Sequence, residues 1–332
     1  MLWIEKYRPD SFEEIIGQEQ VTAHLRSAAV SGNVPHLLLT GPAGTGKSAA
    51  VSCLARLLYG ERSDENHTVI QTADLFEQGK KYLENDERYT HLYRRDESLL
   101  ANFKNITRWY ASIRPLDAAF RLLVFEGASA LTREAQQGLR RIMERYSATC
   151  RFIFVTSRPS AIIPAVSSRC LPFFFAPLSD AVVERKLHAI LAAEYGPSSP
   201  LSTDDIELIV QAASGDLRKA IMLLQVSAGA EDAADLVRCS RTETGQIAQS
   251  AMAAIEGRDL HAAFRRFETL MIEYGLTSPE VLHEFRGAAR KQYNDPRIAV
   301  AIAEADYILT HANNEYIQLN AMIARIAGEV FP

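Results

Sequence analysis

The fold of this 332-residue chain is decided by one stretch, Gly41-Pro42-Ala43-Gly44-Thr45-Gly46-Lys47-Ser48. It follows an apolar run at residues 36–40 and precedes an apolar helical pattern, which is the strand, loop and helix context of a P-loop. Glycines in such a loop let backbone N–H groups turn toward phosphate oxygens, and the helix N-terminus adds its dipole. Lys47 supplies a positive charge and Ser48 a ligand for Mg²⁺. The stretch therefore predicts a nucleotide-phosphate site that takes ATP and Mg²⁺.

Apolar runs at 36–40, 121–125 and 151–155 alternate with helical stretches in the first half of the chain. This alternation is typical of a parallel sheet flanked by helices. Because the runs are continuously apolar, we expect strands that are covered on both faces. The first domain is therefore predicted to be an α/β nucleotide-binding domain over 1–176.

The strand signal disappears after Pro177, and helix-start signals replace it. They stand at Ser179, Thr203, Ser214-Gly215-Asp216, Ser278 and Asp295. The first three predict a small helical domain over 177–232. The last two each precede a proline, which is favoured in the first turn of a helix. They predict an all-helical domain over 233–332.

Charge and composition exclude several classes of protein. A net charge of −5 is unlike that of a domain that coats polyanions throughout, so any nucleic-acid contact must be local. The four cysteines stand singly, without the paired spacing of a zinc site. The N-terminus has charges too early for a signal peptide, and no apolar stretch reaches the length of a membrane span. We expect a cytoplasmic protein with no membrane partner.

The acidic residue that should complete the phosphate site stands alone. A hydrolysing P-loop protein normally has two acids at the end of a second strand, one near the metal and one that activates water. Here the run at 121–125 leads into Glu126-Gly127. If Glu126 is on the metal side, the water-activating position is Gly127; if Glu126 is the base, the metal side falls to Phe125. These are two possible registers of the acid motif. Either register predicts slow hydrolysis, since general-base assistance is worth about 10²- to 10⁴-fold in rate.

Several stretches outside the P-loop resemble one known family. They are Trp3-Ile4-Glu5-Lys6-Tyr7-Arg8-Pro9, the run from Ala135 to Ser147, Ser168-Arg169-Cys170 and Gly215-Asp216-Leu217-Arg218-Lys219-Ala220. The match to that family covers much of the chain, and together these stretches are highly specific. The chain resembles the small subunits of replication factor C, the archaeal and eukaryotic sliding-clamp loader of the AAA+ class. The resemblance implies an AAA+ domain, a helical lid and a C-terminal collar.

The resemblance also implies roles for single residues. Tyr7-Arg8-Pro9 is implied to lie near the adenine, and Arg218 in the lid to reach the γ-phosphate as a second sensor. Ser157 stands at the first-sensor position, where the family has asparagine. Arg169 is implied to enter the nucleotide site of a neighbouring subunit, where such a finger is worth about 10³- to 10⁵-fold in turnover. The implied partners are a large subunit, a second small subunit, the sliding clamp and primer-template DNA.

Three departures from the family pattern shape the functional hypothesis. They are the reduced acid motif at Glu126-Gly127, Ser157, and a longer segment at 72–108 in place of the usual Ser-Asp-Glu-Arg-Gly. The chain is therefore predicted to bind ATP with weak or absent hydrolysis and to supply Arg169 to a neighbour. It would be a specialised second small subunit, of archaeal type, in a hetero-oligomer. The candidate DNA contacts in the altered segment are Lys80, Lys81, Lys104 and Arg108.

Two other hypotheses stay open. One is a self-sufficient AAA+ motor acting on DNA, such as a branch-migration helicase, with Glu126 as the base; the missing second acid argues against it. The other is a non-enzymatic scaffold that uses its nucleotide for stability. The retained Arg169 and Arg218 argue against that scaffold.

Overall fold

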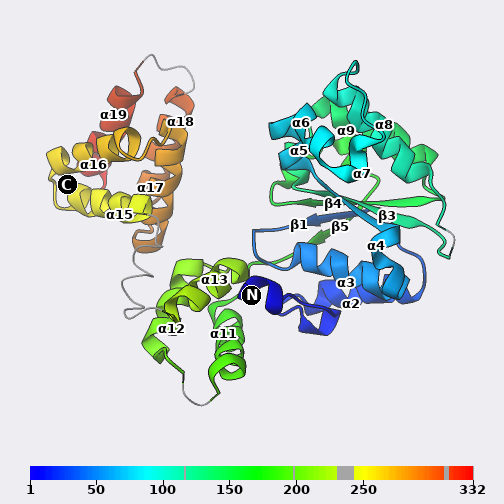
Figure 1. Cartoon of the computed structure of the whole chain (residues 1–332). Coiled ribbons are helices and arrows are strands. Elements are labelled where there is room, and N and C mark those ends of the chain that lie inside the picture. The colour runs from blue at the N-terminus through cyan, green and yellow to red at the C-terminus, as the bar shows by residue number, and fades with distance from the viewer. Residues whose placement is uncertain (116, 197–198, 230–242, 310–313, 332) are drawn as a thin grey trace. The chain divides into compact units, whose positions relative to one another are not determined.

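The fold comes from a computed structural model. It describes residues 1–115, 117–196, 199–229, 243–309 and 314–331. The chain divides into two compact units, Met1–Gly229 and Ala230–Pro332 (Figure 1). Each unit has its own buried core, as expected for a chain longer than one core usually supports. The predicted boundary between residues 232 and 233 lies outside the described residues.

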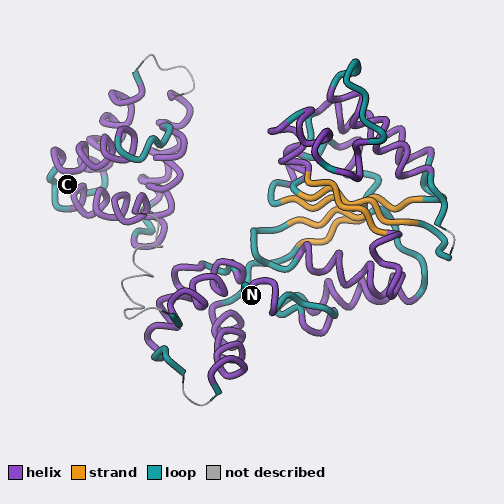
Figure 2. The backbone as a smooth tube through the Cα atoms, viewed as in Figure 1, coloured by secondary structure: helices purple, strands orange, loops and turns teal. Residues whose placement is uncertain are grey.

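The first unit is built on a sheet of strands (Figure 2). The strands are parallel and their order is β2-β3-β4-β1-β5. Its strands are β1 (Leu37–Thr40), β2 (His67–Gln71), β3 (Arg121–Glu126), β4 (Cys150–Thr156) and β5 (Leu171–Phe174). The three predicted apolar runs are β1, β3 and β4, so the predicted α/β class is confirmed. Thr40 pairs with Thr156, and Glu126 pairs with Val155. The P-loop strand and the acid strand therefore end beside β4 at the same edge of the sheet.

Two of the strands were not predicted, for different physical reasons. β2 alternates between buried and partly buried residues and carries the polar His67 and Gln71, so it lacks a continuous apolar run. β5 is an edge strand of the sheet and pairs with β1. It contains Pro172, which has no N–H to donate, and Leu171 and Phe174 are exposed. Proline is tolerated on an edge strand, but in a sequence pattern it argues against a strand.

Helices cover both faces of the sheet, with α2 and α3 on one face and α5 to α9 on the other (Figure 1). The helices up to residue 170 are α1 (Trp3–Lys6), α2 (Glu19–Val30), α3 (Lys47–Tyr59), α4 (Ser63–Asn66), α5 (Thr72–Gln78), α6 (Lys80–Asn85), α7 (Glu87–Thr90), α8 (Leu99–Ser112), α9 (Arg133–Arg145) and α10 (Pro164–Ser167), with short 3-10 helices at Phe12–Glu14, Gly60–Arg62, Ala128–Ala130 and Pro159–Ala161. Leu122 and Val124 of β3 belong to the core on the α3 side, and Leu123 and Phe125 to the core on the α8 and α9 side. The strand is apolar throughout because both of its faces are buried.

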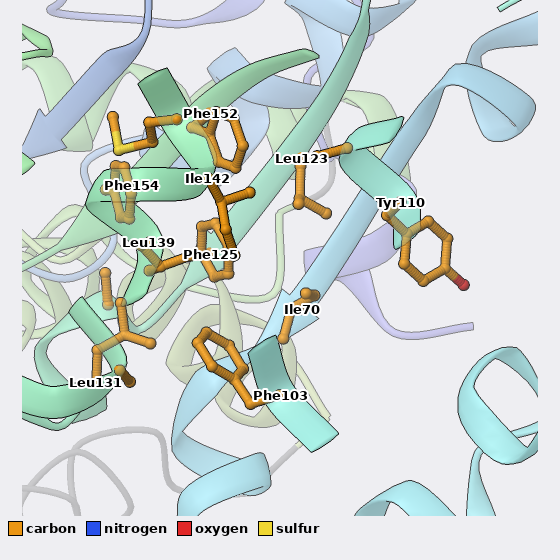
Figure 3. Close-up of a cluster of buried hydrophobic side chains, with 14 of the residues drawn as sticks. Ile70, Phe103, Tyr110, Leu123, Phe125, Leu131, Leu139, Ile142, Phe152 and Phe154 are labelled. Carbon is orange, nitrogen blue, oxygen red and sulfur yellow. The ribbon is translucent and has the colours of Figure 1, made fainter. Parts of the chain in front are cut away.

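Aromatic side chains fill the core between the sheet and helices α8 and α9 (Figure 3). The ring centroid of Phe125 lies 5.1 Å from that of Phe154 and 6.0 Å from that of Phe103. Burying one such side chain contributes about 1.5–3 kcal/mol. Because successive side chains of a strand point to opposite faces, anchoring Phe125 here turns the next residue, Glu126, toward the α3 side.

Three helices complete the first unit. They are α11 (Asp180–Tyr195), α12 (Thr203–Ala213) and α13 (Leu217–Ser227). α12 begins at Thr203 as predicted, and the Ser202 side chain caps it. A helix start was predicted at residues 214–216. Asp216 is the N-cap of α13. Ser214 is instead the C-cap of α12 and has a left-handed conformation with a φ of 49°.

The second unit is helical in its described residues. Its helices are α15 (Glu243–Glu256), α16 (Leu260–Ile272), α17 (Ser278–Gln292), α18 (Pro296–Leu309) and α19 (Glu315–Glu329). α18 begins at Pro296, directly after Asp295, as predicted. The predicted cap Ser278 is wrong by one residue, because Thr277 is the N-cap and forms a capping box with Glu280. In the described parts of the chain, no helix is long and apolar enough to cross a membrane.

Candidate nucleotide-binding site

A pocket of about 800 Å³ lies at the carboxyl ends of the strands in the first unit. This is the usual ligand position in parallel sheets. The sequence-predicted residues that line it are Tyr7, Arg8, Pro9, Ala43, Gly44, Thr45, Gly46, Lys47, Ser48, Glu126, Ser157 and Arg218. Gly41 and Pro42 stand at the base of the loop, where their carbonyl oxygens accept hydrogen bonds from Lys47. Arg169 is the one predicted site residue that lies elsewhere.

Two positions of the loop require glycine, because other atoms lie where a Cβ would stand. Gly41 has a φ of +139°, and a Cβ there would lie 2.2 Å from the carbonyl oxygen of Phe175. Gly44 has a φ of +68°, and a Cβ there would lie 1.8 Å from Oδ1 of Asp216. Asp216 is the N-cap of α13. The loop therefore packs directly against the start of the helix that carries Arg218.

Lys47 is buried at the centre of the loop. Its Nζ donates to the carbonyl oxygens of Gly41, at 2.9 Å, and Pro42. Burial lowers the pKa of this ammonium, while the Glu126 charge opposes the shift and the Arg218 charge adds to it. A buried cation whose partners are neutral carbonyls is strongly stabilised by an added anion. The loop is electrostatically suited to a phosphate group.

Ser48 and Glu126 meet at one side of the pocket. The Ser48 hydroxyl donates to Oε1 of Glu126 at 2.6 Å, whereas Phe125 is fully buried in the opposite core. Of the two registers left open by the sequence, this geometry favours Glu126 beside the metal ligand and Gly127 in the water-activating position. The hydroxyl and carboxylate oxygens fit Mg²⁺, which takes one or two carboxylates and completes its shell with phosphate and water.

The turn after Glu126 is fixed by a residue of the altered segment. Thr72, the first residue of α5, has its Oγ1 at 2.6 Å from the carbonyl oxygens of both Glu126 and Gly127. A Cβ at Gly127 would have its nearest neighbour 3.7 Å away, so the position has room for a Cβ atom. Sequence analysis missed Thr72, because it follows β2, which carries no continuous apolar run.

The N-terminal segment is attached to helices α11 and α13. The backbone N of buried Trp3 donates to Oε1 of Gln225 at 2.8 Å. The Lys6 ammonium and the Tyr7 hydroxyl donate to Oε1 of Glu194 at 2.6 and 2.5 Å. These hydrogen bonds hold the pKa of the Glu194 carboxyl below its usual range. The segment that follows, residues 7–9, is thereby held at the pocket.

An apolar wall beside this segment was also missed by sequence analysis. It is formed by Ile4, Ile15, Ile16, Leu178, Leu217 and Ile221. Apolar walls with a few polar groups are typical of sites for flat organic ligands. These residues come from separate segments and belong to no single motif. Ile4 and Leu217 stand in the quoted family stretches, but only the fold brings the six residues together, so no local sequence signal could have identified the wall.

Arg169 lies away from the chain's own pocket. It stands between α10 and β5, and its guanidinium donates to Glu144 of α9 and to the carbonyl oxygen of Ala165. The side chain is 32% exposed. In this position Arg169 serves no group of the pocket that the same chain forms.

A second hollow, which we call the basic groove, lies between α8 and α9 and measures about 580 Å³. Its charged lining residues are Lys104, Arg108, Glu134, Arg140, Arg141 and Arg145. Of the four predicted DNA contacts, Lys104 and Arg108 line this groove. Lys80 and Lys81 do not, and the Lys80 ammonium donates instead to the carbonyl oxygen of Arg95.

Two solved structures share the fold of the chain. The Aeropyrum pernix ORC1 protein, solved in complex with DNA, has a TM-score of 0.55 at 18% identity, over 91% of this chain and 85% of that chain. A single-residue variant of Thermotoga maritima RuvB has a TM-score of 0.52 at 16% identity, over 83% of this chain and 84% of that chain. At such identities the likeness concerns the fold alone. The fold and the site define a P-loop protein of the AAA+ class.

Sequence relatives narrow this class to one family. A family model described as DNA polymerase III, delta subunit, matches residues 17–179. The replication factor C small subunit of Methanocella arvoryzae is 34% identical over 97% of this chain and 95% of the relative. Replication factor C small subunit 1 of Pyrobaculum arsenaticum is 33% identical over 99% of this chain and 94% of the relative. The chain belongs to the replication factor C small-subunit family, and its role is that of a clamp-loader small subunit in DNA replication.

Proposed function

We propose that this chain is an ATP-binding subunit of a hetero-oligomeric clamp loader and hydrolyses ATP weakly or not at all at its own site. One observation carries the proposal: Glu126 accepts a hydrogen bond from Ser48, and the next residue is Gly127. A carboxylate is present on the metal side, and the position for the water-activating acid has no side chain. The binding groups of the P-loop are all retained. Such a site holds ATP for longer than an intact ATPase does.

Different parts of the pocket bind different parts of the ATP. The loop amides and Lys47 take the β- and γ-phosphates, and Ser48 and Glu126 hold Mg²⁺, which neutralises phosphate charge. Arg218 reaches the γ-phosphate, and its charge already acts on Lys47. The segment at residues 7–9 and the apolar wall take the adenine.

Slow hydrolysis follows from the residues at two positions, 127 and 157. Gly127 has no group that could accept a proton from water, which removes about 10²- to 10⁴-fold in rate. Ser157, which follows β4 and lines the pocket, offers a hydroxyl where the family has an amide. The ATP therefore acts chiefly as a structural ligand of this subunit.

Arg169 acts on the nucleotide of a neighbouring subunit. Its distance from the chain's own pocket and its partly exposed guanidinium support this role. An arginine finger supplied in trans is worth about 10³- to 10⁵-fold in turnover.

The helices of residues 177–232 act as the lid and those of 233–332 as the collar. The chain is a specialised second small subunit of archaeal type, and its partners are a large subunit, another small subunit and the sliding clamp.

Primer-template DNA is bound by the assembled ring, and this chain contributes the basic groove. Five cations and one acid line the groove, although the chain as a whole carries a net charge of −5. Guanidinium and ammonium groups in this arrangement bind phosphates without reading sequence. The DNA contact should therefore weaken steeply with salt.

The test compares the purified chain with the reconstituted loader. Alone, the chain should bind ATP and release almost no phosphate. Added to its partner subunits, wild-type chain should raise their turnover, and Arg169→Ala should not. Robust hydrolysis by the chain alone, lost in Lys47→Ala, would instead support a self-sufficient motor.

A further inference from the structure

The guanidinium of Arg169 is held by one carboxylate and one carbonyl. Oε1 of Glu144 accepts from Nε of Arg169 at 3.1 Å and from Nη2 at 2.5 Å, and the carbonyl oxygen of Ala165 accepts from Nη1 at 2.7 Å. The three contacts involve all three nitrogens, so they fix both the position and the plane of the group. The hydrogen bond from Arg169 is also the main reason why the pKa of Glu144 lies below its usual range, which keeps the carboxylate ionised.

These contacts leave donors for a ligand outside the chain. A guanidinium has about five N–H donors in a planar fork, and the contacts of Arg169 use three of them. The others have no acceptor among the described residues, and the side chain is 32% exposed. A fixed, planar group with unused donors is suited to bidentate recognition of phosphate oxygens.

Glu144 has a second, weaker partner on its own helix. Nε of Arg140 lies 3.4 Å from Oε1 of Glu144, farther than either nitrogen of Arg169. Hydrogen bonds weaken at such distances. Loss of the Glu144 carboxylate should therefore act first on Arg169.

We propose that Glu144 is a positioning residue that orients Arg169 toward the nucleotide of the neighbouring subunit. This inference rests on the proposed role of Arg169 in trans. An untethered arginine samples many rotamers, and holding it in one orientation removes that entropic cost from the transition state. A misplacement of about 1 Å in such a group can cost about 10²-fold in rate. Glu144 itself touches no substrate.

The experiment uses reconstituted clamp loaders in which the neighbouring site is the only one able to hydrolyse ATP. Glu144→Ala should lower kcat at that site by about 10- to 100-fold, with KM and the mass of the assembly little changed. Arg169→Ala should lower kcat further. The double variant should fall no lower than Arg169→Ala, because Glu144 acts only through that residue. Glu144→Asp, which keeps the charge, should recover part of the loss.

Asp117→Asn is the matched control. Asp117 also forms an exposed ion pair with an arginine, Arg62, but it precedes β3, at the end of the sheet opposite the pocket. Its removal should leave kcat unchanged.

Each other outcome has a distinct meaning. Unchanged kcat in Glu144→Ala, together with a loss in Arg169→Ala, would overturn the positioning role alone. A rise in kcat would show that Glu144 restrains the finger instead of aiming it. A further loss in the double variant would show that Glu144 acts independently of Arg169. Unchanged kcat in Arg169→Ala would overturn the proposed function at this point, and the role of Glu144 with it.

Discussion

The hydroxyl of Ser48 lies 2.6 Å from Oε1 of Glu126, which joins the first turn of α3 to the last residue of β3. The contact supports the proposal that Glu126 stands on the metal side of the pocket, because both oxygens are ligands that Mg²⁺ accepts. It also leaves Gly127 as the next position along the chain. In the proposed function, the distinction between binding and hydrolysing ATP depends on this one missing side chain.

Gly127→Glu should increase ATP hydrolysis by the purified chain by about 10²-fold, the lower end of what a general base contributes. A Cβ has room at this position, since its nearest neighbour would lie 3.7 Å away, and Gly127 lines the pocket that would take the rest of the side chain. The positive φ of 65° costs about 1–2 kcal/mol for any residue other than glycine. Gly127→Ala carries the same backbone cost without a carboxylate, so it should gain nothing. Phosphate release measures both, and equal rates in the two variants would contradict the assignment.

Lys47→Ala should weaken ATP binding by about 10- to 100-fold, because a hydrogen bond to a charged group contributes about 1.5–3 kcal/mol. Burial lowers the pKa of Lys47, so its charge by itself does not add to the stability of the folded chain. Titration calorimetry measures the affinity. Arg26→Ala is the control, since Arg26 is an exposed cation on α2 that pairs with Glu13. Equal affinity in wild type and Lys47→Ala would count against the phosphate site.

Gly138→Ala should change stability and DNA affinity in opposite directions. Alanine in the middle of α9 favours the helix by up to about 1 kcal/mol. A Cβ at Gly138 would lie 2.5 Å from Cε of Lys104, and this flexible side chain must move out of the basic groove. The loader should then bind primer-template DNA more weakly, with a salt dependence lowered by up to about one phosphate contact.

Two measurements check this prediction, denaturant unfolding of the chain and DNA titration of the loader at several salt concentrations. Lys104→Ala removes the same ammonium and keeps Gly138, so it should weaken DNA binding without the gain in stability that replacing a helical glycine brings. If Gly138→Ala left the salt dependence unchanged, the basic groove would not be a DNA contact.

Acidification should destabilise the first unit through His36. Burial lowers the pKa of His36 from 6.5 to about 4, and its Nδ1 accepts a hydrogen bond from the backbone N of Phe152 at 3.1 Å. The unfolded chain therefore takes up a proton at a higher pH than the folded chain. Stability falls as the pH drops from about 6.5 toward 4, by about 1–2 kcal/mol once partial exposure is allowed for.

His36→Asn retains an acceptor for Phe152 without a group that titrates in this range. Urea unfolding at pH 7 and pH 4.5 should show a smaller acid loss in the variant than in wild type. The same loss in both would mean that His36 does not carry this part of the pH dependence.

The central strands were predictable because burial on both faces demands continuous apolar runs. This was the case for β1, β3 and β4. The P-loop was predictable because its glycines and Lys47 together form a motif that binds phosphate. β2 and β5 were not, since a half-polar strand and an edge strand with Pro172 leave no such run. Helix starts were predictable to within about a residue, because neighbouring polar residues such as Thr277 and Ser278 compete to cap the same turn.

The residues of the site that belong to sequence motifs were predictable. Those that reach the site only through tertiary contacts were not. The sequence contains the single acid at Glu126 but does not say which register it occupies; that depends on Phe125 turning into the opposite core. Thr72 and the apolar wall reach the pocket through tertiary packing. The partner of Arg169, Glu144, lies 25 residues away in the chain, so no local pattern connects them.

The most direct measurement is the fate of ATP bound to the purified chain. The chain is loaded with γ-labelled ATP and Mg²⁺, free nucleotide is removed, and the bound label is followed over time, with Lys47→Ala as the control for contaminating ATPases. We expect the label to remain in ATP, with conversion at least about 10²-fold slower than in Gly127→Glu. Conversion of bound ATP by wild type as fast as by Gly127→Glu, with Lys47→Ala inactive, would contradict the account.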